Sequence, residues 1–256
     1  MGLEYFDLSG KTALVSGGAT GLGLGICQGL AEAGASLAIC ARRQEVCQEA
    51  AQKLAAEHGV RAVGLRMDVG QGDEIGRAVE ETCSRLGRID ILVNSAGVGG
   101  SEKPILKMSQ EEWQNVLDVN LSGAFHLTRA VAGRMVQAGQ GGKIIHVASI
   151  GGQIVFPNMS AYCSAKAGLV HLTRVMALEW ARHNIQVNAI LPGYFLTPMN
   201  EKLFRTEVGR KLIDRHPMKR IGRIQEIRGL AVMLASPASD FITGSAMVID
   251  GGQSLV

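Results

Sequence analysis

The sequence predicts an α/β protein: a single doubly wound domain of the Rossmann type, with helices on both faces of a seven-stranded parallel sheet. Seven short apolar runs alternate along the chain with longer amphipathic stretches. The runs show almost no alternation of apolar and polar residues, which is typical of strands covered on both faces. Strand–helix–strand alternation indicates one parallel sheet. Since no linker, repeat or low-complexity segment divides the 256 residues, we expect one domain over residues 1–256.

Each element is expected over a defined range. The expected strands are Thr12–Ser16, Ser36–Ala41, Ala62–Arg66, Ile89–Asn94, Lys143–Ser149, Ile185–Leu191 and Ala246–Asp250. The expected helices are Gly21–Ala33, Glu45–Glu57, Asp73–Leu86, Glu111–Gln137, Ala161–Arg182 and Gln225–Ala235. An irregular insert, about 192–222, follows the sixth strand, and ligands of such sheets bind beyond the carboxyl ends of the strands. We predict that this insert is a lid over a ligand site; the alternative is an ordinary surface loop.

Composition and charge exclude several classes of protein. Hydrophobic residues make up 46% of the chain, and the net charge of +3 is not clustered, so nothing favours binding to nucleic acid or an anionic membrane. No apolar stretch approaches the roughly 18 residues of a membrane span, and residues 1–10 show no signal peptide. Five cysteines, an odd number, are typical of reduced thiols in a cytoplasmic protein. The six histidines show no metal-ligand spacing, and His146, within an apolar run, is interpreted as a hydrogen-bonded buried histidine.

A glycine-rich turn joins the first expected strand to the first expected helix. Gly17, Gly21 and Gly23 have the spacing Gly-x3-Gly-x-Gly. Glycines permit a tight turn and let backbone amides approach a pyrophosphate, whose charge the helix N-terminus favours. A plain turn and helix cap is the alternative, because the chain is rich in glycine. The strand before the turn and the helix after it favour a dinucleotide site.

The end of the second expected strand predicts which dinucleotide binds. Enzymes that use NAD usually place an acidic residue there to bind the ribose hydroxyls. This chain has Ala41, Arg42 and Arg43 at that point and no carboxylate. Because a guanidinium fork suits a 2′-phosphate, NADP(H) is favoured over NAD(H), which stays possible. The alternative is that these arginines only begin a solvated helix.

Three residues predict acid–base chemistry. Tyr162 and Lys166 are four residues apart in a helical pattern, so their side chains share one face. A phenol has a pKa near 10, and a fixed ammonium nearby is expected to lower it, which would let Tyr162 give or take a proton. Ser149 ends the fifth expected strand, where its hydroxyl is placed to donate to a developing alkoxide. Taken singly, a snorkelling lysine and a strand-end serine cap are the simpler interpretations.

Together these motifs resemble those of the short-chain dehydrogenase/reductase family, over about Leu8 to Gly252. They occur in the family's order and spacing: the glycine turn, Asp68-Val69, Asn94-Ser95-Ala96-Gly97, Asn120, Ser149, Tyr162 with Lys166, Pro192-Gly193 and Asp250-Gly251-Gly252. One departure is Ser95, where the family usually has a second asparagine. We expect a small effect, since a serine hydroxyl can still bond locally.

The resemblance implies roles for individual residues. Asn120 resembles the helix-kinking asparagine that holds a water in a proton relay to the lysine. The resemblance also implies that Ser149 polarises the carbonyl, that Tyr162 is the acid or base, and that Lys166 binds the nicotinamide ribose as well. The implied cofactor contacts are Gly17, Thr20, Gly21, Leu22, Gly23, Arg42, Arg43, Asp68, Val69, Asn94, Ala96, Gly97, Tyr162, Lys166, Pro192, Gly193 and Thr197.

We therefore expect an NADP(H)-dependent enzyme that interconverts a secondary alcohol and a ketone. The segment 192–200 is similar to that of members acting on gluconate or other polyols, so the expected substrate is a polyol, a sugar acid or a small ketone. A 3-oxoacyl-(acyl carrier protein) reductase is the alternative, although Gly133 and Leu178 stand where such reductases tend to present arginines. A non-catalytic NADP-binding regulator is an alternative of another class; such members usually lose the tyrosine or lysine.

The resemblance also implies a homotetramer, with the helices Glu111–Gln137 and Ala161–Arg182 paired across one two-fold axis and Ala246–Asp250 across another. Both helices carry further small or apolar residues, namely Val116, Ala124, Ala132, Leu169, Leu172 and Met176. An apolar stripe wider than one contact needs must be buried elsewhere, and a dimer contact is the commonest solution. The alternative is that these residues all face the sheet.

Overall fold

A computed structural model, which describes residues 4–197 and 200–256, shows one sheet of seven strands. The strands are β1 (Thr12–Ser16), β2 (Ser36–Ala41), β3 (Ala62–Arg66), β4 (Ile91–Asn94), β5 (Gly142–Val147), β6 (Ile185–Pro192) and β7 (Ala246–Ile249). Their order is β3-β2-β1-β4-β5-β6-β7, and every neighbouring pair is parallel. The predicted fold class is confirmed. The chain reverses its direction across the sheet between β1 and β4, which is where such folds bind ligands.

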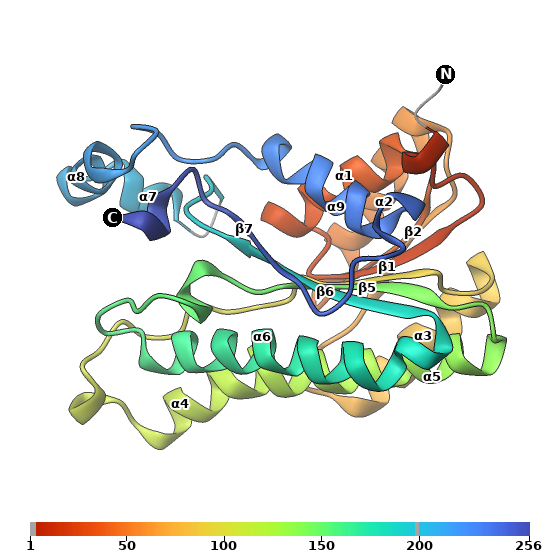
Figure 1. Cartoon of the computed structure of the whole chain (residues 1–256), viewed down its shortest axis with the longest axis horizontal. Coiled ribbons are helices and arrows are strands. Elements are labelled where there is room, and N and C mark those ends of the chain that lie inside the picture. Colours follow the sequence, from red (N-terminus) through yellow and green to blue (C-terminus); the bar gives the residue numbers. More distant parts are fainter. Residues whose placement is uncertain (1–3, 198–199) are drawn as a thin grey trace.

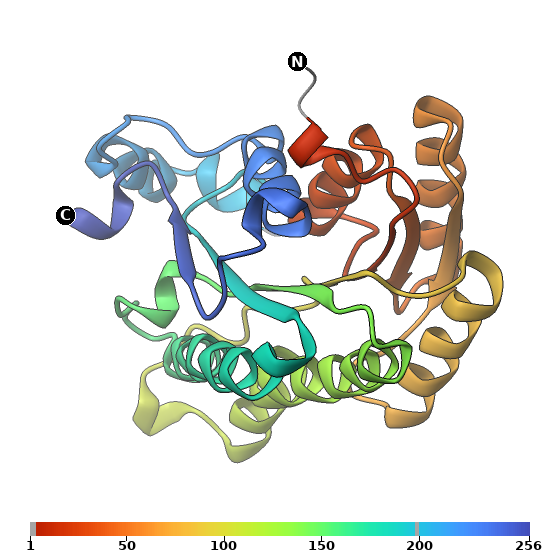
Figure 2. The ribbon, with the colours of Figure 1, turned by 45° about the vertical axis from the view of Figure 1, so that its right-hand side comes forward.

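Helices cover both faces of the sheet, as Figures 1 and 2 show. The helices are α1 (Gly21–Glu32), α2 (Gln44–His58), α3 (Gly72–Leu86), α4 (Gln110–Leu117), α5 (Gly123–Ala138), α6 (Ser160–Trp180), α7 (Glu201–Phe204), α8 (Glu207–Arg215) and α9 (Arg228–Ala235). In Figure 1, α1, α2 and α9 lie above the sheet, and α3, α5 and α6 lie below it. In the described part of the chain, none of them combines the length and the apolar character that crossing a bilayer requires.

Two apolar clusters, one on each face, hold the layers together. Val15 of β1 packs in the cluster that contains Ile26 and Leu30 of α1. The preceding residue, Leu14, belongs to the other cluster, with Leu127 of α5. Because successive strand residues face opposite sides, a strand covered on both faces needs apolar residues throughout. Fully burying one such side chain stabilises the fold by about 1.5–3 kcal/mol.

The expected helix Glu111–Gln137 is interrupted. A π-helical turn, Asp118–Ser122, separates α4 from α5, and it contains Asn120. The side chain of Asn120 turns to the backbone of Val98: its Oδ1 accepts from the Val98 amide at 2.9 Å, and its Nδ2 donates to the Val98 carbonyl at 2.8 Å. π-helical turns are frequent at functional sites. This one anchors the loop after β4 to the helix layer.

The insert after β6 holds the two short helices α7 and α8. It is closed at its base by an isolated bridge between Phe195 and Gly222, with the Leu196 amide donating to the Gly222 carbonyl at 3.0 Å. Figures 1 and 2 place α7 and α8 beyond the end of β6, beside the C-terminus. Pro198 and Met199, part of the segment singled out in the sequence, lie outside the described residues.

Candidate active site

The glycine turn and the loop after β4 form a closely packed crevice. Gly17 has a φ of 64°, and a Cβ atom there would lie 2.7 Å from the backbone nitrogen of Ala96. A Cβ at Gly23 would lie 2.1 Å from the carbonyl oxygen of Gly17. Larger residues therefore do not fit, and the turn leaves the N-terminus of α1 open to an anion. The hydroxyl of Ser16, which no motif had indicated, ties the two loops together by accepting from the Ala96 amide at 3.3 Å.

The crevice is bordered by the first residues of the insert. A Cβ atom added at Gly21 would lie 3.7 Å from the Cγ2 of Thr197, so the side chain of Thr197 borders the N-terminus of α1. Thr20 is exposed at the N-cap of α1, and its side chain makes no capping hydrogen bond. Leu22 is half-buried against the core. Gly193 lies against Asp250, with its amide donating to Ile249 at 3.0 Å.

Two free guanidinium groups follow β2. Arg42 and Arg43 are exposed, and neither takes part in an ion pair with another residue of the ranges 4–197 and 200–256. The Gly18 amide donates to the Cys40 carbonyl at 3.4 Å, so the glycine turn lies directly beside the end of β2. This arrangement fits a phosphate group at the adenosine end of a dinucleotide.

The remaining expected cofactor residues divide between the crevice and the core. Asp68 is half-buried after β3, where its Oδ1 accepts from the Gly70 amide at 2.9 Å. Val69 is buried. Asn94 is buried as well, and its Nδ2 donates to Thr128 at 2.8 Å. The amide of Ser95 donates to the Ser16 carbonyl at 3.1 Å, so the main-chain contact at this departure from the family pattern does not depend on the side chain.

The four expected catalytic residues come together from three elements. On α6, Lys166 is buried, and its Nζ donates to the Val147 carbonyl at 3.0 Å. A Cβ atom at Gly97 would lie 2.8 Å from the Oδ1 of Asn120 and 3.6 Å from the Nζ of Lys166. Gly97 therefore lies against both side chains and leaves room for them. Ser149 lies beyond β5, which ends two residues earlier than expected. Its Oγ accepts from the Gly151 amide at 3.0 Å and so begins a short 3-10 turn.

The pKa of Tyr162 differs from its expected direction. Burial raises it above the usual value, while the Ser149 hydroxyl acts in the lowering direction. The Nζ of Lys166 is 5.7 Å from the centre of the Tyr162 ring and is itself bonded to Val147. Burial also lowers the pKa of Lys166, to about 8. In the protein chain alone, Tyr162 is therefore a neutral phenol at pH 7, which is the state that donates a proton.

A pair of aromatic side chains borders the site; Phe156 belongs to no sequence motif, whereas Tyr194 lies in the segment 192–200. The rings of Phe156 and Tyr194 are stacked, with centroids 6.3 Å apart and planes at 15°. Phe156 reaches the catalytic loop, because its Cε2 is 3.1 Å from where a Cβ of Gly151 would be. Tyr194 also meets Phe204 of α7 edge to face at 5.3 Å. Only the fold brings these residues together.

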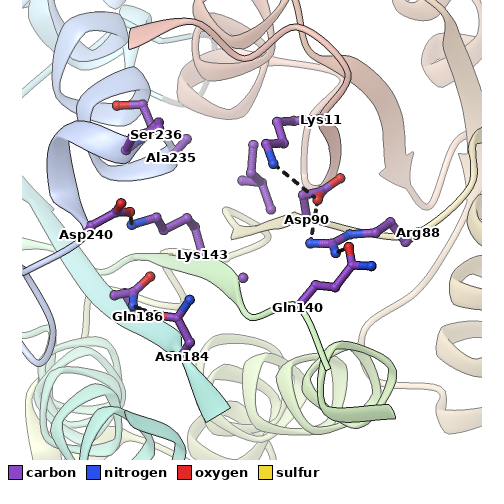
Figure 3. Close-up of a pocket in the computed structure, with 13 residues that line it drawn as sticks. Lys11, Arg88, Asp90, Gln140, Lys143, Asn184, Gln186, Ala235, Ser236 and Asp240 are labelled. Carbon is purple, nitrogen blue, oxygen red and sulfur yellow. Dashed lines mark hydrogen bonds and ion pairs between the residues drawn. The ribbon is translucent and has the colours of Figure 1, made fainter. Parts of the chain in front are cut away.

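A polar cavity of about 200 Å³ lies at the opposite edge of the sheet, among the amino ends of the strands (Figure 3). Its three cations and two carboxylates form ion pairs with one another. Arg88 pairs with Asp90 at 2.6 Å, Lys11 approaches the same carboxylate at 3.9 Å, and Lys143 pairs with Asp240 at 2.7 Å. None of the expected site residues lines this cavity. Its ion pairs join the residue before β1 to the residue before β4, and β5 to the segment after α9.

Similarity to known proteins is extensive. A family model described as enoyl-(acyl carrier protein) reductase matches residues 17–254. The gluconate 5-dehydrogenase of Gluconobacter oxydans is 35% identical over 97% of this chain and 96% of its own length. A short-chain type dehydrogenase/reductase from Mycobacterium marinum is 42% identical, with a TM-score of 0.92 and coverage of 98% of both chains. A gluconate 5-dehydrogenase from Burkholderia cenocepacia, solved with NADP and tartrate, is 36% identical, with a TM-score of 0.94 and coverage of 99% of both.

Proposed function

The chain belongs to the short-chain dehydrogenase/reductase family, and from this premise we propose that it is an NADP(H)-dependent oxidoreductase that interconverts a secondary alcohol and a ketone. One observation carries the proposal. Asn120, Ser149, Tyr162 and Lys166 converge at the carboxyl edge of the sheet, beside the glycine crevice. Four unconnected structural residues would have no reason to do so.

The residues divide the work as follows. When bound, the nicotinamide supplies the hydride. Ser149 donates a hydrogen bond to the substrate oxygen and polarises the carbonyl. Tyr162 gives its proton to that oxygen during reduction and takes it back during oxidation. Lys166 binds the nicotinamide ribose, and Asn120 is a positioning residue that fixes the Val98 loop beside it.

The cofactor contacts follow from the crevice. The N-terminus of α1, at Gly21–Gly23, is placed to meet the pyrophosphate, and Arg42 with Arg43 is placed to hold the 2′-phosphate. The NADP in the Burkholderia relative supports this choice. The other proposed contacts are Asp68, Val69, Asn94, Ala96, Gly97, Tyr162, Lys166, Pro192, Gly193 and Thr197.

Changing Ala41→Asp together with Arg42→Ile is expected to shift preference from NADP(H) towards NAD(H). The new carboxylate accepts from ribose hydroxyls and repels a 2′-phosphate, and the guanidinium that binds this phosphate is gone. The ratio of kcat/KM for NADPH and NADH measures the shift. The control variant Arg85→Ile, at an exposed position on α3, should leave that ratio unchanged. A wild-type enzyme that already prefers NADH would contradict the role of Arg42.

The substrate is proposed to be a polyol, a sugar acid or a small ketone, covered by the insert 192–222 as a lid. The names of the gluconate dehydrogenases among its relatives support the first two. The test is a panel: NADPH with 5-ketogluconate, small diketones and acetoacetyl thioesters, and NADP⁺ with gluconate and polyols. Preference for the thioesters would favour an acyl carrier reductase. Absence of any turnover would favour a non-catalytic NADP-binding regulator.

Assembly into a homotetramer is proposed on different residues from those expected. Val116, Ala124, Ala132, Leu169 and Met176 are already buried within one chain, and Leu172 is partly so, because they face the sheet and neighbouring helices. The sequence argument from these residues was wrong. Exposed apolar side chains on the same helices, among them Val175 and the 82% exposed Leu178, support pairing instead, as does Val248 on the edge strand β7.

Sedimentation at micromolar concentration is expected to give a species of about four times 27.1 kDa. Leu178→Glu should shift the population towards smaller species, whereas Glu49→Gln on the surface of α2 should not. A wild-type species of 27.1 kDa would rule the tetramer out.

A cytoplasmic location is proposed as well, and the five cysteines, all free thiols, support it.

A further inference from the structure

Resting on the proposed oxidoreductase function, we propose that the turn after β7, residues 250–254, holds the insert 192–222 in place, and that Gln253 is a positioning residue for substrate binding. Gln253 acts through Tyr194. Two observations carry the inference. The turn contacts both ends of the insert, and the side chain of Gln253 accepts a hydrogen bond from the Tyr194 amide at 2.8 Å.

The turn 250–254 has a closely defined shape. The Oδ1 of Asp250 accepts from the Gly252 amide at 2.8 Å, and its Oδ2 accepts from the Ser254 amide at 2.7 Å. Gly251 and Gly252 have φ angles of 61° and 85°, which glycine adopts without strain. Because Asp250 directly follows the last residue of β7, the turn is a fixed extension of the edge strand of the sheet.

Both ends of the insert rest on this turn. At the first end, a Cβ atom at Gly193 would lie 2.6 Å from the Cβ of Asp250 and 2.7 Å from the Oε1 of Gln253. At the other end, a Cβ atom at Gly251 would lie 2.7 Å from the Cε1 of His216, whose side chain is buried. Figures 1 and 2 accordingly show α7 and α8 beside the C-terminus. A segment outside the insert therefore supports both of its ends.

The amide of Tyr194 depends on a side chain of the turn. The Tyr194 carbonyl accepts from the Gly222 amide at 2.8 Å, and the Tyr194 amide donates to the Oε1 of Gln253. The preceding amide, that of Gly193, donates to the Ile249 carbonyl at 3.0 Å and needs no side chain. Since a backbone amide without an acceptor is unfavourable, removing the Gln253 carbonyl should release Tyr194 and leave Gly193 in place.

The ring of Tyr194 forms one wall of the proposed substrate site. It follows β6 at the carboxyl edge of the sheet and stacks on Phe156 at 6.3 Å. Phe156 in turn contacts the loop that begins at Ser149, through Gly151. Both rings are half-buried, so ring surface remains open beside the catalytic serine. A displaced wall weakens the binding of the ground state and of the transition state alike, which raises KM and leaves kcat unchanged.

Two variants of Gln253 separate the acceptor from the bulk of the side chain. Gln253→Met removes the acceptor with little change in size, whereas Gln253→Glu keeps an oxygen in the same place. The assay uses NADPH and the panel ketone with the highest kcat/KM, at high salt, where the added charge of the glutamate is screened. Gln253→Met should raise KM for the ketone about threefold to tenfold, the size expected for one lost hydrogen bond, and leave kcat nearly unchanged.

Gln253→Glu should keep the wild-type KM, since its carboxylate still accepts from the Tyr194 amide. In both variants the Kd for NADPH should stay near that of the wild type, because the backbone of Ile249 still holds Gly193. The matched control is Gln52→Met, on the exposed surface of α2, which should change none of these quantities.

Hydrogen exchange of the Tyr194 amide tests the same contact without turnover. Exchange should accelerate about threefold to tenfold in Gln253→Met and stay near the wild-type rate in Gln253→Glu and in Gln52→Met. This readout reports the position of the loop directly, so it does not depend on which ketone the enzyme accepts.

Several outcomes would overturn the inference. Wild-type KM and wild-type exchange in Gln253→Met would remove the role of this side chain. An equal rise of KM in Gln253→Glu would show that the acceptor is not what matters, and a smaller assembly of Gln253→Met on sedimentation would assign the effect to subunit packing. Absence of turnover with every ketone in the wild type would instead overturn the proposed function, whereas the exchange rates would still decide whether Gln253 positions Tyr194.

Discussion

Replacing Tyr162 with phenylalanine is expected to lower kcat by a factor of about 10²–10⁴ and to change the Kd for NADPH far less. Only the hydroxyl is removed, and the ring keeps its place on α6, packed in the cluster that contains Val116 and Ala165. The chain then has no group to donate a proton to the carbonyl oxygen as hydride arrives. Steady-state rates and fluorescence titration with NADPH measure the two quantities.

The matched control is Tyr5→Phe, since Tyr5 is 72% exposed and far along the chain from the site. Its activity should equal that of the wild type. Because burial raises the pKa of Tyr162, alcohol oxidation, which needs the phenolate, should accelerate as pH rises, whereas ketone reduction should not. Retention of more than about a tenth of kcat in Tyr162→Phe would exclude this residue as the acid, given the usual size of such effects.

Acid is expected to destabilise the fold through His146. This histidine is buried between Thr128, 3.1 Å from its Nε2, and Thr173, 2.9 Å from its Nδ1, which confirms that its nitrogens are hydrogen-bonded. Burial, aided by the charge of Lys166, lowers its pKa from 6.5 to about 3. The unfolded chain therefore binds a proton before the folded chain does. The neutral, buried His146 therefore costs the fold nothing above pH 6.5. Below that pH the free energy of unfolding falls by about 1.4 kcal/mol for each pH unit, down to about pH 3.

Urea unfolding at several pH values measures the free energy of unfolding and so tests this dependence. In His146→Gln, which cannot titrate, fewer protons are taken up on unfolding. The slope of the free energy of unfolding against pH, between pH 6.5 and 4, should therefore be smaller by the contribution of about one proton, whatever the stability of the variant at pH 7. The exposed His126→Gln should keep the wild-type slope. If His146→Gln kept it as well, the buried imidazole would not be the group responsible.

Local patterns predicted the parts of the fold that local forces decide. The apolar runs of β1, β2 and β3 gave their bounds correctly, because most residues of a strand covered on both faces are apolar. For β5, the apolar run continues through Ala148, although the ladder ends at Val147. There the Ser149 hydroxyl captures the Gly151 amide and starts a turn instead. Apolar character alone does not mark where pairing stops.

In the candidate site, too, local sequence patterns predicted some features and missed those that depend on residues far apart in the sequence. Tyr162 and Lys166 were found because four residues along a helix fix their common face. The effect of burial on the pKa of Tyr162 depends on side chains far apart in sequence, so its direction was expected wrongly. The stacked pair of Phe156 and Tyr194, 38 positions apart, has no local signal at all. Exposure of Leu178, as against burial of Leu169, likewise depends on which face of α6 the sheet takes.

The central claim is that this site transfers hydride between a nicotinamide and a carbonyl carbon. The most direct measurement uses NADPH deuterated at C4, on the transferred face, with a ketone from the panel and mass spectrometry of the product. The account predicts one deuterium in the alcohol, bound to the former carbonyl carbon, with wild-type enzyme and almost none with Tyr162→Phe in the same time. An alcohol product free of deuterium, or no alcohol from any ketone, would contradict it.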